Sequence, residues 1–503
     1  MEKIVREILN GISVRDNLIQ LKEELKEASY IDAFLTCISF DMDFFRNLLC
    51  HKDAKVRKNI IKIIGLCGLD GLAPDVFDAY QKDETQFLKA EYIKVLKQWD
   101  CKPYEKELLN RLNKLKEMQK GQEWEKHTIA ELRQLNEVLT NLGAVKKHQF
   151  IGGDTMSTMI LTTLSGKEKY LKRVIDERIG EGKTMLLRGG VRVQSSDYDN
   201  LMKVRCFQEL LFVMPGAAKL GGAASEMVEQ LIKAGLMNYL TERISGLASI
   251  PFRVELRGVR GDSDKMKLTK QLSAQLERQS GHDLVNAPSN YAVEFRFHKK
   301  QEGDNYSCYI KIGLLSDERF SYRRHVLPTS IQPYVAAMIM EIVKEYKQEW
   351  GQILDPFCGV GTMLMECNYR QHAHSIYGVD IYQEGIEYAK QHAKKAKMDI
   401  HYIHKDMAEF THNYLFDFIV TDLPSEGGQM TEEKIAEIYE TFLEKCYEWM
   451  SEDAVIAAYT KSPALLEKAI AGQKKLCLIT HTDMYKQGKS GLYILRAKRD
   501  ATI

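Results

Sequence analysis

The spacing of apolar residues divides the chain into regions with different predicted elements. Up to residue 116, apolar side chains recur every three or four positions, which predicts helices. From residue 149, short stretches alternate or run apolar, as at 158–164 and 252–257, and these predict strands. From residue 353, short apolar runs alternate with helical stretches, the order typical of a sheet covered by helices. The sequence therefore predicts a multidomain protein of the α plus α/β class.

These changes of pattern set four predicted regions. Residues 1–116 are predicted as a helical domain and residues 117–148 as a strongly charged helical linker. Residues 149–315 are predicted as an α+β region, and residues 316–503 as a Rossmann-like domain.

The helical region carries a pattern that recurs along the chain. The sequences HKD at 51–53 and VR at 56–57, followed by a helix that closes on Gly65, are similar to a HEAT-type helix pair. A second unit follows from Pro74, so residues 31–99 are predicted to hold two or three stacked pairs. A plain helical bundle is the alternative.

One stretch has the composition of a ligand-binding turn, DPFCGVGT at residues 355–362. Apolar residues precede it and helical spacing follows it, which gives a strand, a glycine turn and a helix. A dinucleotide would need a third glycine where the chain has Leu364. Asp355 suits a cationic or amine-bearing ligand better than a phosphate, and a turn without any ligand is the alternative.

Acidic residues also end the strands predicted after this turn. Asp380 ends an apolar run at 375–380, and Asp422 ends another at 416–422. Because open α/β sheets bind ligands beyond the carboxyl ends of their strands, these acids are predicted to line one site. Asp380 lies at the spacing at which an acid takes up ribose hydroxyls in nucleotide-binding folds.

This series of motifs resembles the class I S-adenosylmethionine-dependent methyltransferases, and within them the THUMP-associated RNA guanine-N2 methyltransferases. DPFCGVGT is close to that family's cofactor loop, and DLPS at 422–425 lies where the family carries Asn/Asp-Pro-Pro-Tyr. The resemblance is strong over residues 325–503 and weaker over 150–315. It implies a methyltransferase with S-adenosyl-L-methionine as its cofactor.

The resemblance also implies cofactor-binding residues. The glycine turn is expected to hold the amino-acid moiety, Asp380 the ribose and Asp406 the adenine amino group. Ser330, beside Thr329, is expected near the methionine end, and the alternative is that it caps the next helix. Each acid taken alone has the same alternative of capping a helix. The expected residues are Ser330, Asp355, Pro356, Cys358, Gly359, Gly361, Thr362, Asp380, Ile381, Asp406 and Met407.

Methyl transfer to an exocyclic amine requires the amine nitrogen to be positioned and its protons to be held. The Asp422 carboxylate and the Leu423 carbonyl are each expected to accept one N–H, while Pro424 fixes the turn and adds no donor. The family places a base-stacking aromatic residue at the position of Ser425, which cannot stack. Candidate replacements are Tyr322, Tyr334 and Tyr459.

The middle region is predicted to bind RNA. Residues 155–213 have the element order of the family's ferredoxin-like segment, and 252–312 have that of a THUMP domain, a module that binds the 3′ CCA end of tRNA. Its basic residues face phosphates in one interpretation and line the solvent side of a half-buried sheet in the other. They are Arg253, Arg257, Arg260, Lys265, Lys267, Lys270, Lys299 and Lys300.

Composition limits the classes of function. Apolar residues make up 44% of the chain and charged residues 28%, and no apolar run reaches the length of a membrane span. The ten cysteines include no C-x-x-C pair and the histidines fit no compact ligand set, so a reducing cytoplasm is expected, without disulfides or metal. A net charge of +1 gives no overall support for nucleic acid, so any basic surface must be local.

The leading prediction is a cytoplasmic enzyme that methylates the N2 amine of a guanosine in RNA, most readily tRNA. One alternative is an RNA-binding protein whose methyltransferase domain has lost catalysis, which Ser425 suggests. Another is an amino methyltransferase acting on rRNA, DNA or protein. The HEAT-like region is predicted either to widen the RNA contact or to bind a protein partner.

Overall fold

A computed structural model shows the fold of the protein. It describes residues 1–118, 126–144, 148–246, 249–301, 303–426, 430–485 and 488–498. The chain forms two compact units, one of residues 1–152 with 214–314 and one of residues 153–213 with 315–503. None of the helices in these described ranges is long and apolar enough to cross a membrane.

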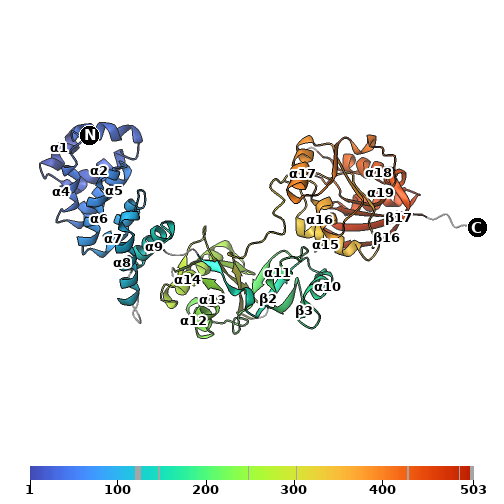
Figure 1. The fold of residues 1–503 in the computed structure, drawn as a ribbon, viewed down its shortest axis with the longest axis horizontal. Coiled ribbons are helices and arrows are strands. Elements are labelled where there is room, and N and C mark those ends of the chain that lie inside the picture. The colour runs from blue at the N-terminus through green and yellow to red at the C-terminus, as the bar shows by residue number, and fades with distance from the viewer. Residues whose placement is uncertain are drawn as a thin grey trace, which may run out of the picture. The chain divides into compact units, whose positions relative to one another are not determined.

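The first unit begins with the helices that the sequence predicts, drawn from blue to teal in Figure 1. They are α1 (Glu2–Leu9), α2 (Val14–Glu24), α3 (Ile31–Cys37), α4 (Asp43–Leu49), α5 (Ala54–Leu66), α6 (Ala73–Lys82), α7 (Gln86–Leu96), α8 (Glu105–Met118) and α9 (Lys126–Asn141). Their apolar faces meet in one core, in which Ile60 and Ile64 of α5 have no exposed surface. The predicted helical N-terminal region is confirmed, whereas residues 119–125 and 145–147 of the predicted linker lie outside the described residues.

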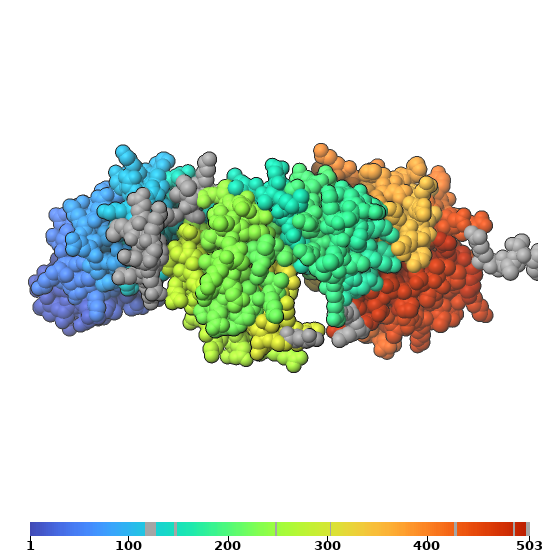
Figure 2. All heavy atoms as spheres, turned by 90° about the horizontal axis from the view of Figure 1, so that it is seen from below, coloured from blue at the N-terminus to red at the C-terminus, as the bar shows by residue number. Residues whose placement is uncertain are grey.

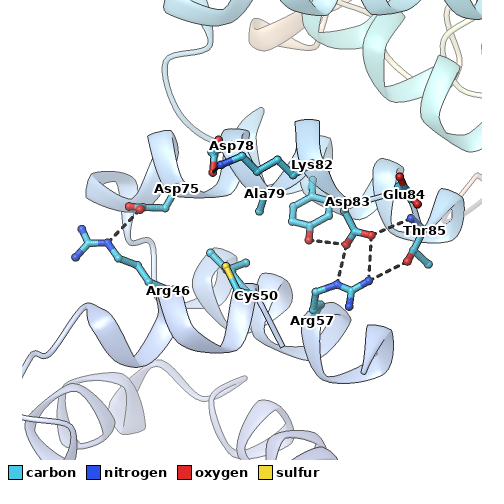
Figure 3. Close-up of a pocket in the computed structure, with 12 residues that line it drawn as sticks. Arg46, Cys50, Arg57, Asp75, Asp78, Ala79, Lys82, Asp83, Glu84 and Thr85 are labelled. Atoms are coloured by element: carbon cyan, nitrogen blue, oxygen red, sulfur yellow. Dashed lines mark hydrogen bonds and ion pairs between the residues drawn. The ribbon is translucent and has the colours of Figure 1, made fainter. Parts of the chain in front are cut away.

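Charged side chains connect successive helices of this region around a cleft of about 520 Å³. Arg57 on α5 donates to both carboxylate oxygens of Asp83, at 2.8 and 3.0 Å, and to Thr85 Oγ1 at 2.8 Å. The Tyr92 hydroxyl donates to the same carboxylate at 2.9 Å. Figure 3 shows Arg57 pointing toward Asp83 and Thr85. Arg46 donates to one carboxylate oxygen of Asp75 at 3.0 Å. These bonds tie one helix pair to the next.

The remainder of the first unit is an α+β layer. Its strands follow the order β10-β9-β7-β8, and β7 runs parallel to both neighbours while β10 runs antiparallel to β9. A separate pair is formed by β1 and β6. The elements are β1 (Gln149–Phe150), α12 (Ala224–Lys233), α13 (Leu236–Thr241), β6 (Ile244–Ser245), β7 (Ile250–Arg257), α14 (Asp262–Gln279), β8 (Leu284–Asn286), β9 (Val293–Lys299) and β10 (Tyr306–Ile312).

The spacing of apolar residues over 224–241 predicts a single helix, but the structure divides it in two. The first helix ends before Gly235, which has a φ of +89°. This left-handed conformation costs glycine little, and it redirects the chain between α12 and α13. Amphipathic spacing continues across the break, which is why the pattern alone predicts one helix.

The second unit begins with antiparallel strands in the order β3-β4-β2-β5. Its elements are β2 (Ser157–Thr162), α10 (Glu168–Ile179), β3 (Thr184–Leu187), β4 (Gly190–Ser195), α11 (Tyr198–Leu201) and β5 (Leu210–Phe212). The strand β2 alternates buried and half-buried residues along its length, the pattern of a sheet with one face in the core.

A seven-stranded sheet forms the rest of the second unit, with order β13-β12-β11-β14-β15-β17-β16. The first five strands of this order are parallel, and β17 is antiparallel to both neighbours. Figure 2 shows these residues, orange to red, as one continuous body. The elements are α15 (Pro333–Val343), β11 (Gln352–Asp355), α16 (Thr362–Arg370), β12 (Ser375–Asp380), α17 (Gln383–Ala396), β13 (His401–His404), β14 (Phe416–Asp422), α18 (Glu432–Trp449), β15 (Met450–Thr460), α19 (Pro463–Gly472), β16 (Leu476–Asp483) and β17 (Gly491–Ala497). The predicted Rossmann-like domain is confirmed.

Residues 153–213 group with this α/β domain, although the sequence placed them with 149–315. A buried ion pair explains the grouping. Arg205 donates to both oxygens of Glu366 at 2.6 and 2.8 Å, and Tyr322 donates to the same carboxylate at 2.8 Å. The Arg205 guanidinium also stacks 3.8 Å from the centre of the Tyr369 ring. The functional domain boundaries remain a prediction.

We predict that Arg205→Ala lowers the free energy of unfolding by about 3 to 5 kcal/mol, because it leaves the fully buried Glu366 carboxylate without its partner. Equilibrium urea unfolding measures this loss. The double variant Arg205→Met with Glu366→Leu should recover most of it, since no charge is then left buried. Arg188→Ala, at an exposed arginine of the same segment, is the matched control and should change the stability by less than about 0.5 kcal/mol.

Candidate functional site

The carboxyl end of β11 leads into a turn that requires two glycines. Gly359 and Gly361 have φ values of +49° and +80°, in the left-handed region. A Cβ at Gly361 would lie 2.3 Å from the hydroxyl of Tyr402, so this glycine is needed for packing. A Cβ at Gly359 would meet nothing within 4 Å. The backbone at Gly359 therefore borders open space, in which a ligand can approach it.

Asp380, at the end of β12, is fixed to this turn. Its two carboxylate oxygens accept from the backbone N–H groups of Gly359 at 2.7 Å and Tyr382 at 2.9 Å. The side chain is almost fully buried, and burial raises the pKa of the carboxyl group. A carboxylate has about four acceptor positions, so Asp380 keeps capacity for ligand hydroxyls.

Asp355 lies deepest, with 1% of its surface exposed. The Thr421 hydroxyl donates to it at 2.6 Å and the Phe357 N–H at 3.1 Å. Burial raises the pKa of Asp355 to about 8, and the neighbouring charges of Asp380 and Asp422 act in the same direction. The ends of three adjacent strands thus bring together carboxylates that repel one another, an arrangement that a bound cation would stabilise.

Asp422 ends β14 and faces the same site. Burial raises its pKa to about 7, against the nearby positive charge of Lys461. Within the described residues, no donor is hydrogen-bonded to this carboxylate or to the Leu423 carbonyl. Both acceptors predicted for an amine are therefore free of protein partners in this part of the chain.

The turn after Asp422 is held from two sides. The Leu423 N–H donates to Tyr459 O at 2.8 Å, which extends the pairing of β14 with β15. On the other side, the Tyr439 hydroxyl on α18 donates to Pro424 O at 2.6 Å and lies 2.7 Å from Thr460 Oγ1. The backbone that presents the Leu423 carbonyl is thus fixed before any substrate binds.

The other predicted cofactor residues occupy varied environments. Pro356, Cys358 and Thr362 are buried in the glycine turn, whereas Ile381 beside Asp380 is 59% exposed. Asp406 is exposed and caps a short 3₁₀ turn by accepting from the Ala408 N–H at 2.8 Å, with Met407 buried next to it. This is the capping alternative, and the second carboxylate oxygen accepts no hydrogen bond from the residues that the structure describes.

Ser330 does not cap α15. Its Oγ accepts from the Leu327 N–H at 3.0 Å, and the residue before the helix is Gln332, which makes no side-chain cap. The capping alternative for Ser330 is wrong because the serine closes its own tight turn two residues too early.

Several residues that shape the site gave no signal in the sequence. On α17, Nδ1 of His392 lies 3.0 Å from the Val360 carbonyl oxygen. Nε2 of the same ring accepts a hydrogen bond from the His325 N–H at 3.1 Å, so the ring is neutral and its proton is on Nδ1. Gly385 packs against Gly359, because a Cβ at Gly385 would lie 3.2 Å from the Gly359 carbonyl oxygen. Each acts across a long stretch of sequence, as Thr421 and Tyr439 do, and no local motif marks such contacts.

The predicted RNA-binding residues lie in the first unit, and acidic neighbours pair with several of them. Arg253 donates to Glu294 and stacks 4.1 Å from the centre of the Tyr291 ring. Arg257 pairs with Glu255, and Lys299 with Asp304. The exposed members of the set are Arg257, Arg260, Lys267, Lys270 and Lys300.

Comparison with known proteins identifies the family of this site. Residues 321–487 match the profile of the RMKL-like methyltransferase domain, UPF0020. This part of the chain is a methyltransferase domain. The prediction of a class I methyltransferase is thereby confirmed.

Individual relatives agree with this assignment. The tRNA (guanine(10)-N2)-dimethyltransferase of Methanothermobacter thermautotrophicus is 22% identical over 245 residues, which are 46% of this chain and 70% of that protein. TrmN from Thermus thermophilus superposes with a TM-score of 0.53 at 19% identity, covering 68% of this chain and 99% of TrmN. SMU.472 in complex with SAH gives a TM-score of 0.50 at 14% identity, covering 69% of this chain and 99% of the other. These superpositions show a shared fold.

The titration of Asp355 leads to a prediction on stability. Its pKa in the folded protein, about 8, lies above the ordinary value of about 3.9, so the fold binds a proton that the unfolded chain releases. This contribution to stability is complete below about pH 4 and is lost as the pH rises to about 8. Asp355→Asn cannot ionise, and its free energy of unfolding should fall less than that of the wild type between pH 5 and pH 8.5.

Urea unfolding at the two pH values tests this. Asp406→Asn removes an exposed carboxylate of the same domain and should follow the wild type. An identical pH dependence of Asp355→Asn and wild type would contradict the proposed burial of a neutral carboxyl group at this position.

Proposed function

We propose that the protein transfers a methyl group from S-adenosyl-L-methionine to the exocyclic N2 amine of a guanosine in tRNA. The observation that carries this proposal is the end of β14, where the Asp422 carboxylate and the Leu423 carbonyl are fixed beside the acidic cluster and hydrogen-bonded by no described donor. The archaeal relative named above, a tRNA guanine-N2 dimethyltransferase, supports the choice of substrate.

The glycine turn and the strand-end acids fit S-adenosyl-L-methionine as cofactor. Buried beside the turn, the Thr362 hydroxyl and the Tyr402 hydroxyl lack a hydrogen-bond partner among the described residues, as expected where a polar ligand binds. Asp355 compensates the cationic amino-acid end, with the turn's backbone close to it. Asp380 accepts from the ribose hydroxyls, and Asp406 with Met407 borders the adenine.

The chain's own residues position the amine and take its proton. When bound, S-adenosyl-L-methionine supplies an already electrophilic methyl group, so no covalent enzyme intermediate is needed. Asp422 Oδ and the Leu423 carbonyl each accept one amine N–H, which directs the nitrogen lone pair away from the protein. With a pKa of about 7, Asp422 is suited to receive the proton that the amine loses.

Ser425 favours a second candidate function. The related family places its base-stacking aromatic at this position, and serine offers no ring. A methyltransferase domain that binds RNA and cofactor without transferring a methyl group would tolerate this change. The fixed Leu423 and Pro424 backbone and the strongly perturbed Asp422 argue for the active enzyme, because a site without catalysis does not need them.

The finer parts of the proposal concern the first unit. Residues 149–315 include a THUMP-like region that holds the RNA through exposed basic residues such as Arg260, Lys267 and Lys300. The Arg57–Asp83 contact between successive helix pairs supports a HEAT-like arrangement for residues 1–116. Such a region widens the RNA contact or carries a protein partner. Action on tRNA places the enzyme in the cytoplasm.

The proposal is tested by incubating the full chain with tritiated S-adenosyl-L-methionine and total tRNA, followed by digestion to nucleosides. Label is expected in N2-methylguanosine. Asp422→Asn keeps the shape and one acceptor but cannot take the proton, so it should lower kcat about 100- to 10,000-fold. Calorimetry should show cofactor affinity within a few-fold of the wild type.

Two other results are informative. Cofactor binding without label in tRNA, rRNA or DNA would support the catalytically inactive RNA-binding protein. Label in rRNA or DNA alone would identify an amino methyltransferase with another substrate.

A further inference from the structure

An extruded base needs an aromatic surface beside the acceptors that hold its amine. The turn after β14 lacks one, because Ser425 stands at the position expected for a stacking residue. If the proposed base methylation is correct, the ring must come from another element that reaches the same edge of the sheet. It must also have a face open to the substrate.

Two of the tyrosines named from the sequence fail this requirement. Tyr322 is 2% exposed and its hydroxyl donates to Glu366. Tyr459 lies next to Asp422 in the sheet but is also 2% exposed, with its ring in the core. Tyr334, in the first turn of α15, is half-buried. A ring of this kind can wall the pocket but offers little surface to a base.

The strand register brings a further tyrosine to this edge. Asp422 pairs with Tyr459 on β15, Tyr459 pairs with Leu492 on β17, and Leu492 pairs with Thr482 on β16. The strands β14, β15 and β16 run in one direction, so their carboxyl ends share the edge at which Asp422 lies. Tyr485 follows β16 by two residues and is 38% exposed.

Contacts around Tyr485 hold it on the side of the site. Met484 is fully buried, and its N–H donates to Ser490 O at 3.0 Å, which turns the chain back toward β17. The buried Lys167 donates to Thr482 Oγ1 at 2.6 Å, so the segment 153–213 braces the end of β16.

Tyr485 lies close enough to the pocket wall to affect two of its tyrosines. Burial and then a hydrogen bond with Tyr485 raise the pKa of Tyr334. Burial raises the pKa of Tyr459 to about 12, and the charge of Asp422 and the neighbouring Tyr485 act in the same direction. Tyr485 thus interacts with two tyrosines of the site, one of which neighbours the catalytic carboxylate. With 38% of its surface exposed, Tyr485 keeps area available to a base.

We propose that Tyr485 supplies the stacking face for the target base, in the role that Ser425 cannot fill. This inference rests on the proposed function and deepens it, because it assigns the specificity for a planar, extruded base to the turn after β16. Tyr334 positions the Tyr485 hydroxyl without touching the base.

The test measures steady-state methylation of tRNA by the full chain. Tyr485→Ala removes the ring and should lower kcat/KM for tRNA about 5- to 150-fold, while calorimetry shows unchanged cofactor affinity. Tyr485→Phe keeps the ring and should stay within about threefold of the wild type. Tyr447→Ala is the matched control. That tyrosine is 41% exposed on α18 just before β15 begins, at the opposite edge of the sheet.

A rescue variant separates stacking from a merely structural role. Ser425→Tyr in the Tyr485→Ala background returns an aromatic ring to the pocket from the other side, and it should recover at least part of the lost kcat/KM. A Tyr485→Phe variant as defective as Tyr485→Ala, or a Tyr485→Ala variant within twofold of the wild type, would overturn the inference while wild-type methylation stands. If the wild type methylates no nucleic acid, the proposed function itself fails, and the inference fails with it.

Discussion

The second unit is organised around carboxylates buried at one edge of a parallel sheet. Asp355, Asp380 and Asp422 end adjacent strands, and each has its pKa raised by burial. Such groups are costly to bury without partners. Backbone N–H groups and Thr421 satisfy the first two, but the cluster keeps an excess of acceptors. The site is therefore preorganised for a ligand that brings positive charge and donors.

The same constraint explains why residues far away in the sequence surround the glycine turn after β11. The backbone at Gly359 must stay accessible to a ligand while the turn stays rigid. The contacts that hold the turn therefore come from residues outside it. His392 lies against the Val360 carbonyl, and Arg205 with Tyr322 anchors Glu366 on the helix that follows. The segment 153–213 thereby becomes a structural part of the methyltransferase unit. Its loss would remove the partner of a buried charge and disturb the helix that begins at the turn.

The helical region of the first unit is built on a different principle. Its contacts are local and repeat from one helix pair to the next, with an apolar core inside and ion pairs such as Arg57 with Asp83 across the pairs. The charged groups that line the cleft pair with one another, Arg57 with Asp83 and Arg46 with Asp75. This cleft is therefore a joint between helices, and it shows no sign of a ligand site comparable with the acidic edge of the second unit.

The sequence by itself determined the elements whose information is local. Helical spacing gave the N-terminal helices, and the order of apolar runs, glycines and terminal acids gave the Rossmann-like sheet with Asp355, Asp380 and Asp422 at one edge. Gly235 divides the helix predicted over 224–241, because the spacing of apolar residues does not show where the backbone adopts a left-handed conformation. Only the tertiary structure decided which unit residues 153–213 join and that Tyr485 follows a strand that ends at the same edge of the sheet as Asp422. These depend on single contacts between residues distant in the chain, and no periodicity records such contacts.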